Sequence, residues 1–303
     1  MNSTRTFSVQ DYNLDATLDS GQAFRWQLSG DHWIGIIKDK SVRLKGDAFA
    51  ISAETAEPVQ DWTWLEHYLQ LDLDWPAVVR TFPADAPMAQ AVRECHGLRL
   101  LRQDPWECLA SFLMSSTKQI VQIRQIITLL CERFGEPIPA FPGCGPALAF
   151  PSAARLARCT EADLRACKMG FRAPYLLETS RMIAVGHFDL SRLGELPLEL
   201  ARAELLKCPG VGRKIADCVL LFAYGFQAAF PVDVWVMKAL RQLYFPRRRV
   251  SLKRMHHFAG THFGPWGGYA QQYLFHYMRT RAPEPGDLPR NHRRKSALRA
   301  KKS

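Results

Sequence analysis

The sequence lacks any pair of cysteines at C-x-x-C spacing, although it contains eight cysteines. Neither the paired spacing of a zinc finger nor that of an iron–sulfur cluster is therefore present. Most of the cysteines lie within segments of apolar periodicity, so we expect buried, reduced thiols. His256, His257 and His262 have no cysteine pair at finger spacing either, and we expect them on a helix and its surface.

Long apolar runs are also lacking. No stretch of about eighteen apolar residues occurs, and the first residues, MNSTRTFSVQ, contain no apolar signal-peptide core. These absences predict a protein that neither spans a membrane nor is secreted, and that works in a bacterial cytoplasm or a nucleus. The net charge of +11 predicts a polyanionic partner. Nucleic acid is favoured over an acidic membrane surface, because no basic amphipathic helix dominates.

Two periodicities divide the chain, whose 47% hydrophobic residues suffice for a large core. Over residues 1–60, runs such as FRWQL, HWIGII and SVRLKG alternate between apolar and polar residues, which predicts antiparallel strands. From about residue 61 the period is 3.6, which predicts helices. We therefore expect an α+β protein with an antiparallel β domain and following short helices (1–98), a helical body (99–283) and a basic disordered tail (284–303).

The predicted tail ends in RNHRRKSALRAKKS, which has no acidic residue. A solvated terminus and a non-specific DNA-binding arm are about equally good interpretations of it.

The helical body shows both start signals and breaks. Helices are predicted near residues 75–82, 86–95, 104–115, 118–134, 160–168, 172–185, 234–245, 251–263 and 266–281. In Asp104-Pro105-Trp106-Glu107, we expect Asp104 to cap a helix and Glu107 to reach back to the cap. Residues 135–151 are rich in proline and glycine, which indicates a loop.

Residues 204–237 hold the densest group of signals, ELLKCPGVGRKIADCVLLFAYGFQAAFPVDVWVM. The apolar spacing on both sides of Pro-Gly-Val-Gly predicts helix, tight turn, helix. We expect Gly210 and Gly212 to supply positive φ angles there. The amides at the start of the second helix form an anion site, which a DNA phosphate would fit.

Lys214 and Asp233 are the candidate catalytic residues of this stretch. The helix dipole disfavours an ammonium in the first turn, and a neutral lysine is a nucleophile. Taken alone, Lys214 is more often a surface charge or a phosphate contact, and Asp233, just before an apolar-periodic run, is more often only an N-cap. The occurrence of both residues at this spacing favours a catalytic role, in which Asp233 faces the lysine.

At these residues the sequence resembles a known family. LKCPGVG, GRKIADC and FPVDVW are similar to the helix-hairpin-helix DNA glycosylases, specifically the 8-oxoguanine DNA glycosylase/AP lyases, and the resemblance extends over residues 7–281. It implies a bifunctional repair enzyme that flips 8-oxoguanine out of the duplex, excises it through a Schiff base on Lys214, and nicks the strand by β-elimination. Asp233 would stabilise positive charge on the sugar or help to deprotonate the lysine. No cofactor would be required.

The resemblance also implies a base pocket. Its residues would be Gly21, Cys218, Pro231, Gln271 and Phe275. Cys218 and Phe275 would pack on the two faces of the base, although their own spacing indicates ordinary core residues. Gln271 would bind the Watson–Crick edge, which explains an amide in an apolar stripe. The carbonyl of Gly21 would accept from N7–H, a hydrogen that guanine lacks.

Further residues would contact the DNA. These are Thr117, Gln122, Phe171, Arg172, Gly210, Gly212 and Trp235. Thr117 and Gln122 stand where the family has an asparagine and an arginine that read the opposite cytosine, and Phe171 replaces a tyrosine wedge. The sequence therefore predicts a relaxed opposite-base preference. Trp235 replaces a phosphate-contacting histidine.

The resemblance further implies a structural cation bound by the hairpin carbonyls of Leu206, Cys208 and Val211. The expected partner is double-stranded DNA containing oxidised guanine, with no membrane, and the protein is expected to be a monomer. Two alternatives stay open. An alkylated-base glycosylase of the same superfamily needs only the aspartate and water, and a DNA-binding module without catalysis needs neither Asp233 nor Gln271.

Overall fold

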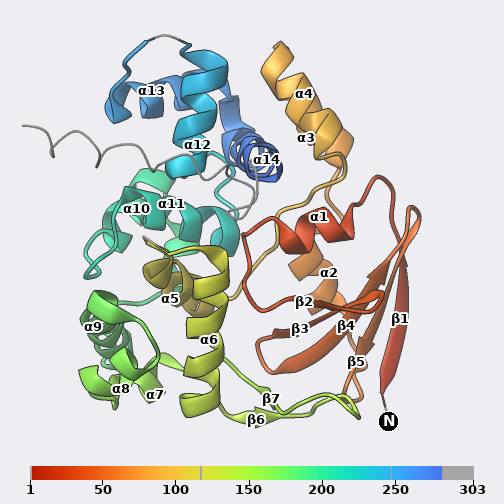
Figure 1. The fold of residues 1–303 in the computed structure, drawn as a ribbon, viewed down its shortest axis with the longest axis vertical. Helices are drawn as coiled ribbons and strands as arrows, with labels where there is room; N and C mark the ends of the chain where they lie inside the picture. Colours follow the sequence, from red (N-terminus) through yellow and green to blue (C-terminus); the bar gives the residue numbers. More distant parts are fainter. Residues whose placement is uncertain (1, 117, 247, 282–303) are drawn as a thin grey trace, which may run out of the picture.

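The computed structural model describes residues 2–116, 118–246 and 248–281. Thr117 and the predicted tail lie outside the described residues. The N-terminal part contains a five-stranded antiparallel sheet with the order β1-β5-β4-β3-β2 (Figure 1). Its strands are β1 (Ser3–Ser8), β2 (Gln27–Ser29), β3 (His32–Ile37), β4 (Lys40–Gly46) and β5 (Ala50–Thr55).

The strands form because one face of the sheet is apolar. In β3 every second residue is buried, as the alternation predicts. This face packs on the short helices α1 (Leu14–Asp19) and α2 (Thr63–Leu69) in a core of its own. Trp26 lies at its centre, 1% exposed, and its indole donates to Tyr68 Oη at 2.8 Å.

The rest of the chain is helical. Its longer helices are α5 (Pro105–Ser115), α6 (Ile120–Phe134), α9 (Ala173–Ala184), α13 (Leu252–His262) and α14 (Gly267–Thr280). Shorter helices are α3 (Trp75–Arg80), α4 (Ala86–Glu94), α7 (Ala153–Ala157), α8 (Glu161–Ala166), α10 (Leu198–Leu205), α11 (Arg213–Val219) and α12 (Val234–Ala239). Two helices continue as single π turns, α11 into η3 (Leu220–Tyr224) and α12 into η4 (Leu240–Tyr244). The 3₁₀ turns are η1 (Gly170–Arg172), η2 (Ser191–Glu195) and η5 (Gly264–Trp266).

The helices surround α5 and α14, whose residues are buried on nearly all sides. The short helices α3 and α4 follow the sheet in sequence, but they pack on α14 rather than on the sheet. Trp75, for example, donates its indole N–H to Tyr273 Oη at 2.8 Å. The predicted fold class, an antiparallel sheet followed by a helical body, is confirmed, whereas the division at residue 98 stays a prediction.

Two local expectations need correction. Asp104 caps α5 through the amides of Trp106 and Glu107, as predicted. Glu107 does not reach back to the cap, because its carboxylate lies 3.5 Å from Arg25 Nη1 instead. The predicted loop 135–151 contains a small two-stranded sheet, β6 (Pro137–Ile138) with β7 (Ala147–Leu148).

Seven of the eight cysteines are buried and free, as expected, and Cys144 is exposed. Among the described residues, no helix combines the length and the apolar character needed to cross a membrane.

Candidate active site

The hairpin forms as the sequence predicts. Helices α10 and α11 flank a turn in which Gly210 has a φ of +76°, and a Cβ there would lie 2.6 Å from Tyr175 Cδ2. Only glycine fits this position. The expectation for Gly212 was wrong. Its φ is −98°, in extended backbone, because it is the N-cap of α11, and nothing lies within 4 Å of where its Cβ would be.

Lys214 lies half-buried in the first turn of α11. Its Nζ donates to Ser115 Oγ at 3.3 Å and lies 4.9 Å from the ring centroid of Phe112. Both partners belong to α5, which packs against α11. The amine is thus oriented by a hydroxyl and a ring face. The described residues contain no ion pair between Lys214 and Asp233.

Asp233 caps α12, and its Oδ1 accepts from the Val236 amide at 2.8 Å. Burial raises the pKa of its carboxyl above the ordinary value, and the amide of Val236 and the charge of Lys214 offset part of this rise. The capping bond engages Oδ1, and the amides of Trp235 and of Asp233 itself also lower the pKa of the carboxyl. The influence of Lys214 on the pKa shows that the two predicted catalytic residues lie close enough for their charges to interact.

Cys218 follows Lys214 by one turn of α11 and is 3% exposed. Burial raises the pKa of its thiol to about 12, although the Lys214 charge opposes this. The sulfur is therefore a neutral, apolar surface beside the lysine. Pro231 is also buried, two residues before Asp233.

On α14, Gln271 and Phe275 lie one turn apart on the same face. Gln271 is 3% exposed, yet its Oε1 has no hydrogen-bond partner among the described residues. An unmet buried acceptor costs about 1–3 kcal/mol. The Gln271 Oε1 is therefore available to accept a hydrogen bond from a ligand.

Gly21 lies beside this face. Its φ is +77°, and a Cβ there would lie 2.8 Å from Ile120 Cδ1 and 3.4 Å from Phe275 Cε1. Its backbone amide and carbonyl form no hydrogen bond with the residues that the structure describes. The structure therefore brings Gly21 to Phe275 and leaves its polar groups available.

One predicted DNA contact, Arg172, contacts the hairpin turn, and its neighbour Phe171 packs against it. Arg172 donates from Nη1 to the carbonyl of Gly210 at 3.3 Å, and its guanidinium lies 5.0 Å from the Phe171 ring centroid. Phe171 itself is 54% exposed on η1. An exposed aromatic ring with a cationic neighbour is suited to stack on nucleic-acid bases.

The remaining predicted contacts are less tightly grouped. The Trp235 ring lies 5.3 Å from Lys238 Nζ on α12. Gln122 is exposed at the start of α6, where its Oε1 accepts from the Gln119 amide at 3.0 Å. Gln122 thus has a capping role that its position in the sequence did not reveal.

At the predicted cation site, the Cys208 carbonyl accepts from the Val211 amide at 3.1 Å. A carbonyl oxygen has a second lone pair, so this bond is compatible with a cation ligand. Leu206 is 45% exposed and Val211 7%. The described residues contain no group of three His, Cys, Asp or Glu side chains that could hold a metal ion.

The structure adds residues that the sequence analysis missed. Ser115 holds the Lys214 amine, and Ile120 lies against Gly21. Behind the hairpin, Arg202 of α10 donates to Asp217 of α11 at 2.6 Å, and both are buried. The only sequence signals were an arginine and an aspartate at otherwise apolar positions on adjacent helices.

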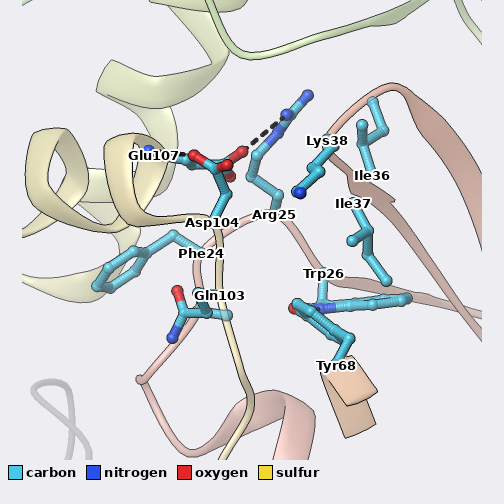
Figure 2. A pocket seen from close by; sticks show the side chains of 11 residues that line it. Phe24, Arg25, Trp26, Ile36, Ile37, Lys38, Tyr68, Gln103, Asp104 and Glu107 are labelled. Atoms are coloured by element: carbon cyan, nitrogen blue, oxygen red, sulfur yellow. Dashed lines mark hydrogen bonds and ion pairs between the residues drawn. The ribbon is translucent and has the colours of Figure 1, made fainter. Parts of the chain in front are cut away.

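A small cavity of about 20 Å³ lies elsewhere, between the sheet and the start of α5. Figure 2 shows Arg25 and Glu107 joined across it, with Lys38 nearby. No predicted site residue lines it. Burial raises the pKa of Glu107, and Arg25 offsets part of this rise. This cavity accommodates about one water molecule and is not the predicted base pocket.

Comparisons with known proteins agree with this geometry. Residues 6–109 match the family model "8-oxoguanine DNA glycosylase, N-terminal domain", and residues 110–259 match "HhH-GPD superfamily base excision DNA repair protein". A probable N-glycosylase/DNA lyase of Methanothermobacter thermautotrophicus is 34% identical over 66% of this chain and 69% of its own length. The N-glycosylase/DNA lyase of Saccharomyces cerevisiae is 30% identical over 84% of this chain and 79% of its own length.

A solved structure is also similar. It is the Clostridium acetobutylicum 8-oxoguanine glycosylase/lyase in complex with double-stranded DNA containing cytosine opposite 8-oxoguanine. Its TM-score is 0.85, with 33% identity over 92% of this chain and 98% of that one.

The chain therefore belongs to the 8-oxoguanine DNA glycosylase family of the HhH-GPD superfamily of base excision DNA repair proteins. The predicted family is confirmed, and with it a role in base excision DNA repair. The roles of single residues stay predictions.

Proposed function

We propose that this protein excises 8-oxoguanine from double-stranded DNA through a Schiff base on Lys214 and then cleaves the strand as a lyase. The unmet Oε1 of Gln271, beside Phe275 and on the same side as Gly21, is the observation that carries this proposal. A noncatalytic DNA clamp does not require this acceptor at the face of α14 that Gly21 approaches. The protein would act as a monomer on DNA in a bacterial cytoplasm or a nucleus.

The chemistry begins at Lys214. The amine attacks C1′ of the flipped nucleotide while the C1′–N9 bond breaks and the base leaves with the electron pair. Asp233, ionised, stabilises the positive charge on the sugar. The sugar ring then opens to a protonated Schiff base. The released base, which left as an anion, takes the C2′ proton, and departure of the 3′ phosphate with the electrons of its bond to C3′ completes β-elimination. Hydrolysis of the Schiff base then frees the lysine. The hydrogen bond from Lys214 to Ser115 supports an amine held in place before attack.

The base would lie between Cys218 and Phe275, near Pro231. Both faces are apolar, since the Cys218 thiol is neutral and buried. Gln271 would accept from the Watson–Crick edge, and the free carbonyl of Gly21 from N7–H. Guanine offers a lone pair at N7, so it would leave that carbonyl unmet at a cost of about 1–3 kcal/mol.

The duplex would be opened by Phe171, whose exposed ring would fill the gap left by the flipped base. Phosphates and the flanking strand would be held by Arg172, Gly210, Gly212 and the indole N–H of Trp235. Gln122 uses its amide oxygen to cap α6, and a glutamine lacks the fork of an arginine. Together with Thr117, which lies outside the described residues, it supports a relaxed opposite-base preference.

No redox cofactor or catalytic metal enters this mechanism. A structural cation on the carbonyls of Leu206, Cys208 and Val211 would bridge the hairpin to a phosphate. The Cys208 carbonyl accepts from the Val211 amide and keeps a second lone pair for such a cation.

The test uses duplexes with 8-oxoguanine opposite each of the four bases, in single-turnover reactions, with undamaged guanine and 3-methyladenine duplexes as controls. We expect excision and nicking at 8-oxoguanine, with rates across the four duplexes that differ by less than about tenfold. Excision of 3-methyladenine alone would assign the protein to alkylated-base repair. Binding without excision of any base would make it a binding module.

A further inference from the structure

The residues on both sides of Gly21 are held by hydrogen bonds from distant side chains, whereas the amide and carbonyl of Gly21 have no partner among the described residues. We call residues 19–22 the Gly21 segment. Every neighbour of Gly21 in this segment has its carbonyl held by a side chain from another part of the protein. Arg279 Nη2 donates to the Asp19 carbonyl, Gln272 Nε2 to the Ser20 carbonyl at 3.0 Å, and Gln103 Nε2 to the Gln22 carbonyl at 2.8 Å.

The side chains of the segment are held as well. Asp19 accepts from Arg279 Nη2 and from Arg124 Nη2, each at 3.1 Å. The side-chain amide of Gln22 is fully buried. Its Nε2 donates to the carbonyl of Arg99 at 2.8 Å, and its Oε1 accepts from the backbone amide of Leu101 at 2.8 Å. The Gly21 segment therefore has little freedom to move, whereas the Gly21 amide and carbonyl have no partner among the described residues.

Two of these anchors come from α14. Gln272 and Arg279 are seven residues apart, two turns, and so lie on one face of the helix. Gln271 and Phe275 lie on the adjacent face, which Gly21 approaches. One helix thus carries the predicted base contacts and also holds the peptide that stands opposite them. A fixed distance between a carbonyl and its ligand is what discrimination by a single hydrogen bond requires.

We propose that Arg279 is a positioning residue for the recognition of 8-oxoguanine. Together with Gln272 it holds the Gly21 segment against α14, so that the Gly21 carbonyl keeps a fixed place in the base pocket. Neither residue touches the base. This inference rests on the proposed function, because it concerns the recognition of 8-oxoguanine at the same site.

The proposal separates two activities. Excision of 8-oxoguanine requires a base in the pocket, whereas cleavage at a preformed abasic site requires only Lys214 and the sugar. Loosening the Gly21 segment should therefore lower excision and leave abasic-site cleavage unchanged. A purely structural role would lower both activities together, because the hairpin and the pocket share one core.

The experiment compares Arg279→Lys, Arg279→Gln and Asp19→Asn with the wild-type protein. Arg279 donates to the carbonyl and the carboxylate of Asp19 from the single nitrogen Nη2, which its planar guanidinium holds in place, whereas a lysine keeps the charge on a shorter and more flexible side chain. The control is Arg281→Gln, two residues further along, which breaks an exposed pair with Glu94. Single-turnover excision of 8-oxoguanine and cleavage of an abasic duplex are measured for each, with thermal unfolding to check the fold.

We expect Arg279→Gln to lower 8-oxoguanine excision on the order of 10- to 100-fold, as misplacement by about 1 Å does, while abasic cleavage stays within about twofold of wild type. Arg279→Lys and Asp19→Asn should lie between, and Arg281→Gln should match the wild type. Equal losses in both activities, or no loss in excision, overturn the proposal. If the wild-type protein cleaves abasic sites but does not excise 8-oxoguanine, the proposed function itself fails, and this inference with it.

Discussion

Gly21 and Phe275 lie near opposite ends of the chain and meet in the structure, where a Cβ at Gly21 would lie 3.4 Å from Phe275 Cε1. The sheet-bearing N-terminal part and the helix α14 thus jointly form one side of the predicted base pocket. This contact joins the N-terminal part to the helical body at the predicted base pocket.

The first prediction concerns Gly21→Ala. Its φ of +77° disfavours any side chain, and the new methyl would lie 2.8 Å from Ile120 Cδ1. We expect a loss of about 1–3 kcal/mol in the free energy of unfolding and a loss of 8-oxoguanine excision. The matched control is Gly30→Ala, at φ +63° with nothing within 4 Å, which should share the strain and keep the activity. Urea unfolding and single-turnover excision measure both, and equal activity in the two variants would contradict the account.

A second prediction concerns the pH dependence of Asp233. Because burial raises its pKa, ionisation costs the folded state stability as the pH rises from the ordinary carboxyl pKa through the raised one. Asp233→Asn removes this cost and keeps an N-cap. The variant should be at least as stable as wild type at pH 7 and lose that advantage in acid, while excision falls on the order of 10²- to 10³-fold. Thermal unfolding of both proteins from pH 3 to 8 tests the direction of this pH dependence. A stability advantage of Asp233→Asn over wild type that grows toward acid would refute it.

The third prediction concerns the pair behind the hairpin. Burial raises the pKa of Asp217, and the charges of Arg202 and Arg213 oppose this rise. Arg202→Met should destabilise the protein by about 3–5 kcal/mol, since it removes the buried partner and leaves the carboxylate only the half-exposed Arg213, 3.6 Å away. Adding Asp217→Leu should restore most of the loss.

A matched control is Arg165→Met, which breaks an exposed ion pair in which Arg165 Nε lies 2.6 Å from Glu161 Oε1. It should cost less than about 1 kcal/mol. Urea unfolding compares the variants, and a double variant no more stable than Arg202→Met would show that the pair acts by packing rather than by charge.

The fourth prediction separates duplex opening from chemistry. Phe171 is 54% exposed, so Phe171→Ala should change the stability by less than about 0.5 kcal/mol. Excision from a fully paired duplex should fall about tenfold, because the gap left by the flipped base stays unfilled. A target inside a small bulge is already unstacked and should be affected less. Single-turnover rates on the two substrates give the comparison, and equal losses on both would rule out a wedge.

Periodicity predicted the long helices well. α14 begins and ends within one residue of the predicted range, since its apolar spacing extends over four turns. The six-residue helix α1 was not predicted, because it lies within the N-terminal stretch whose other runs alternate as strands do. Gly212 was assigned a positive φ from its residue type alone, whereas the helix start that follows it sets its conformation.

Contacts between distant segments could not be predicted from the sequence. The bond from Lys214 to Ser115 joins two helices whose packing no local pattern encodes. Glu107 shows the same limit, because its local pattern predicts a capping role and Arg25 competes for its carboxylate in the fold. The resemblance, in contrast, placed Gly21 beside Phe275, which the residues alone would have assigned to a turn and to the core.

The central claim is a covalent bond between Lys214 and the sugar. The most direct measurement incubates the protein with an 8-oxoguanine duplex and borohydride, and then identifies the attached residue by mass spectrometry of the digested adduct. The account predicts a stable adduct on Lys214 that is absent in Lys214→Gln, a variant that should still bind the duplex. An adduct on another residue, or excision of the base with no adduct, would contradict it.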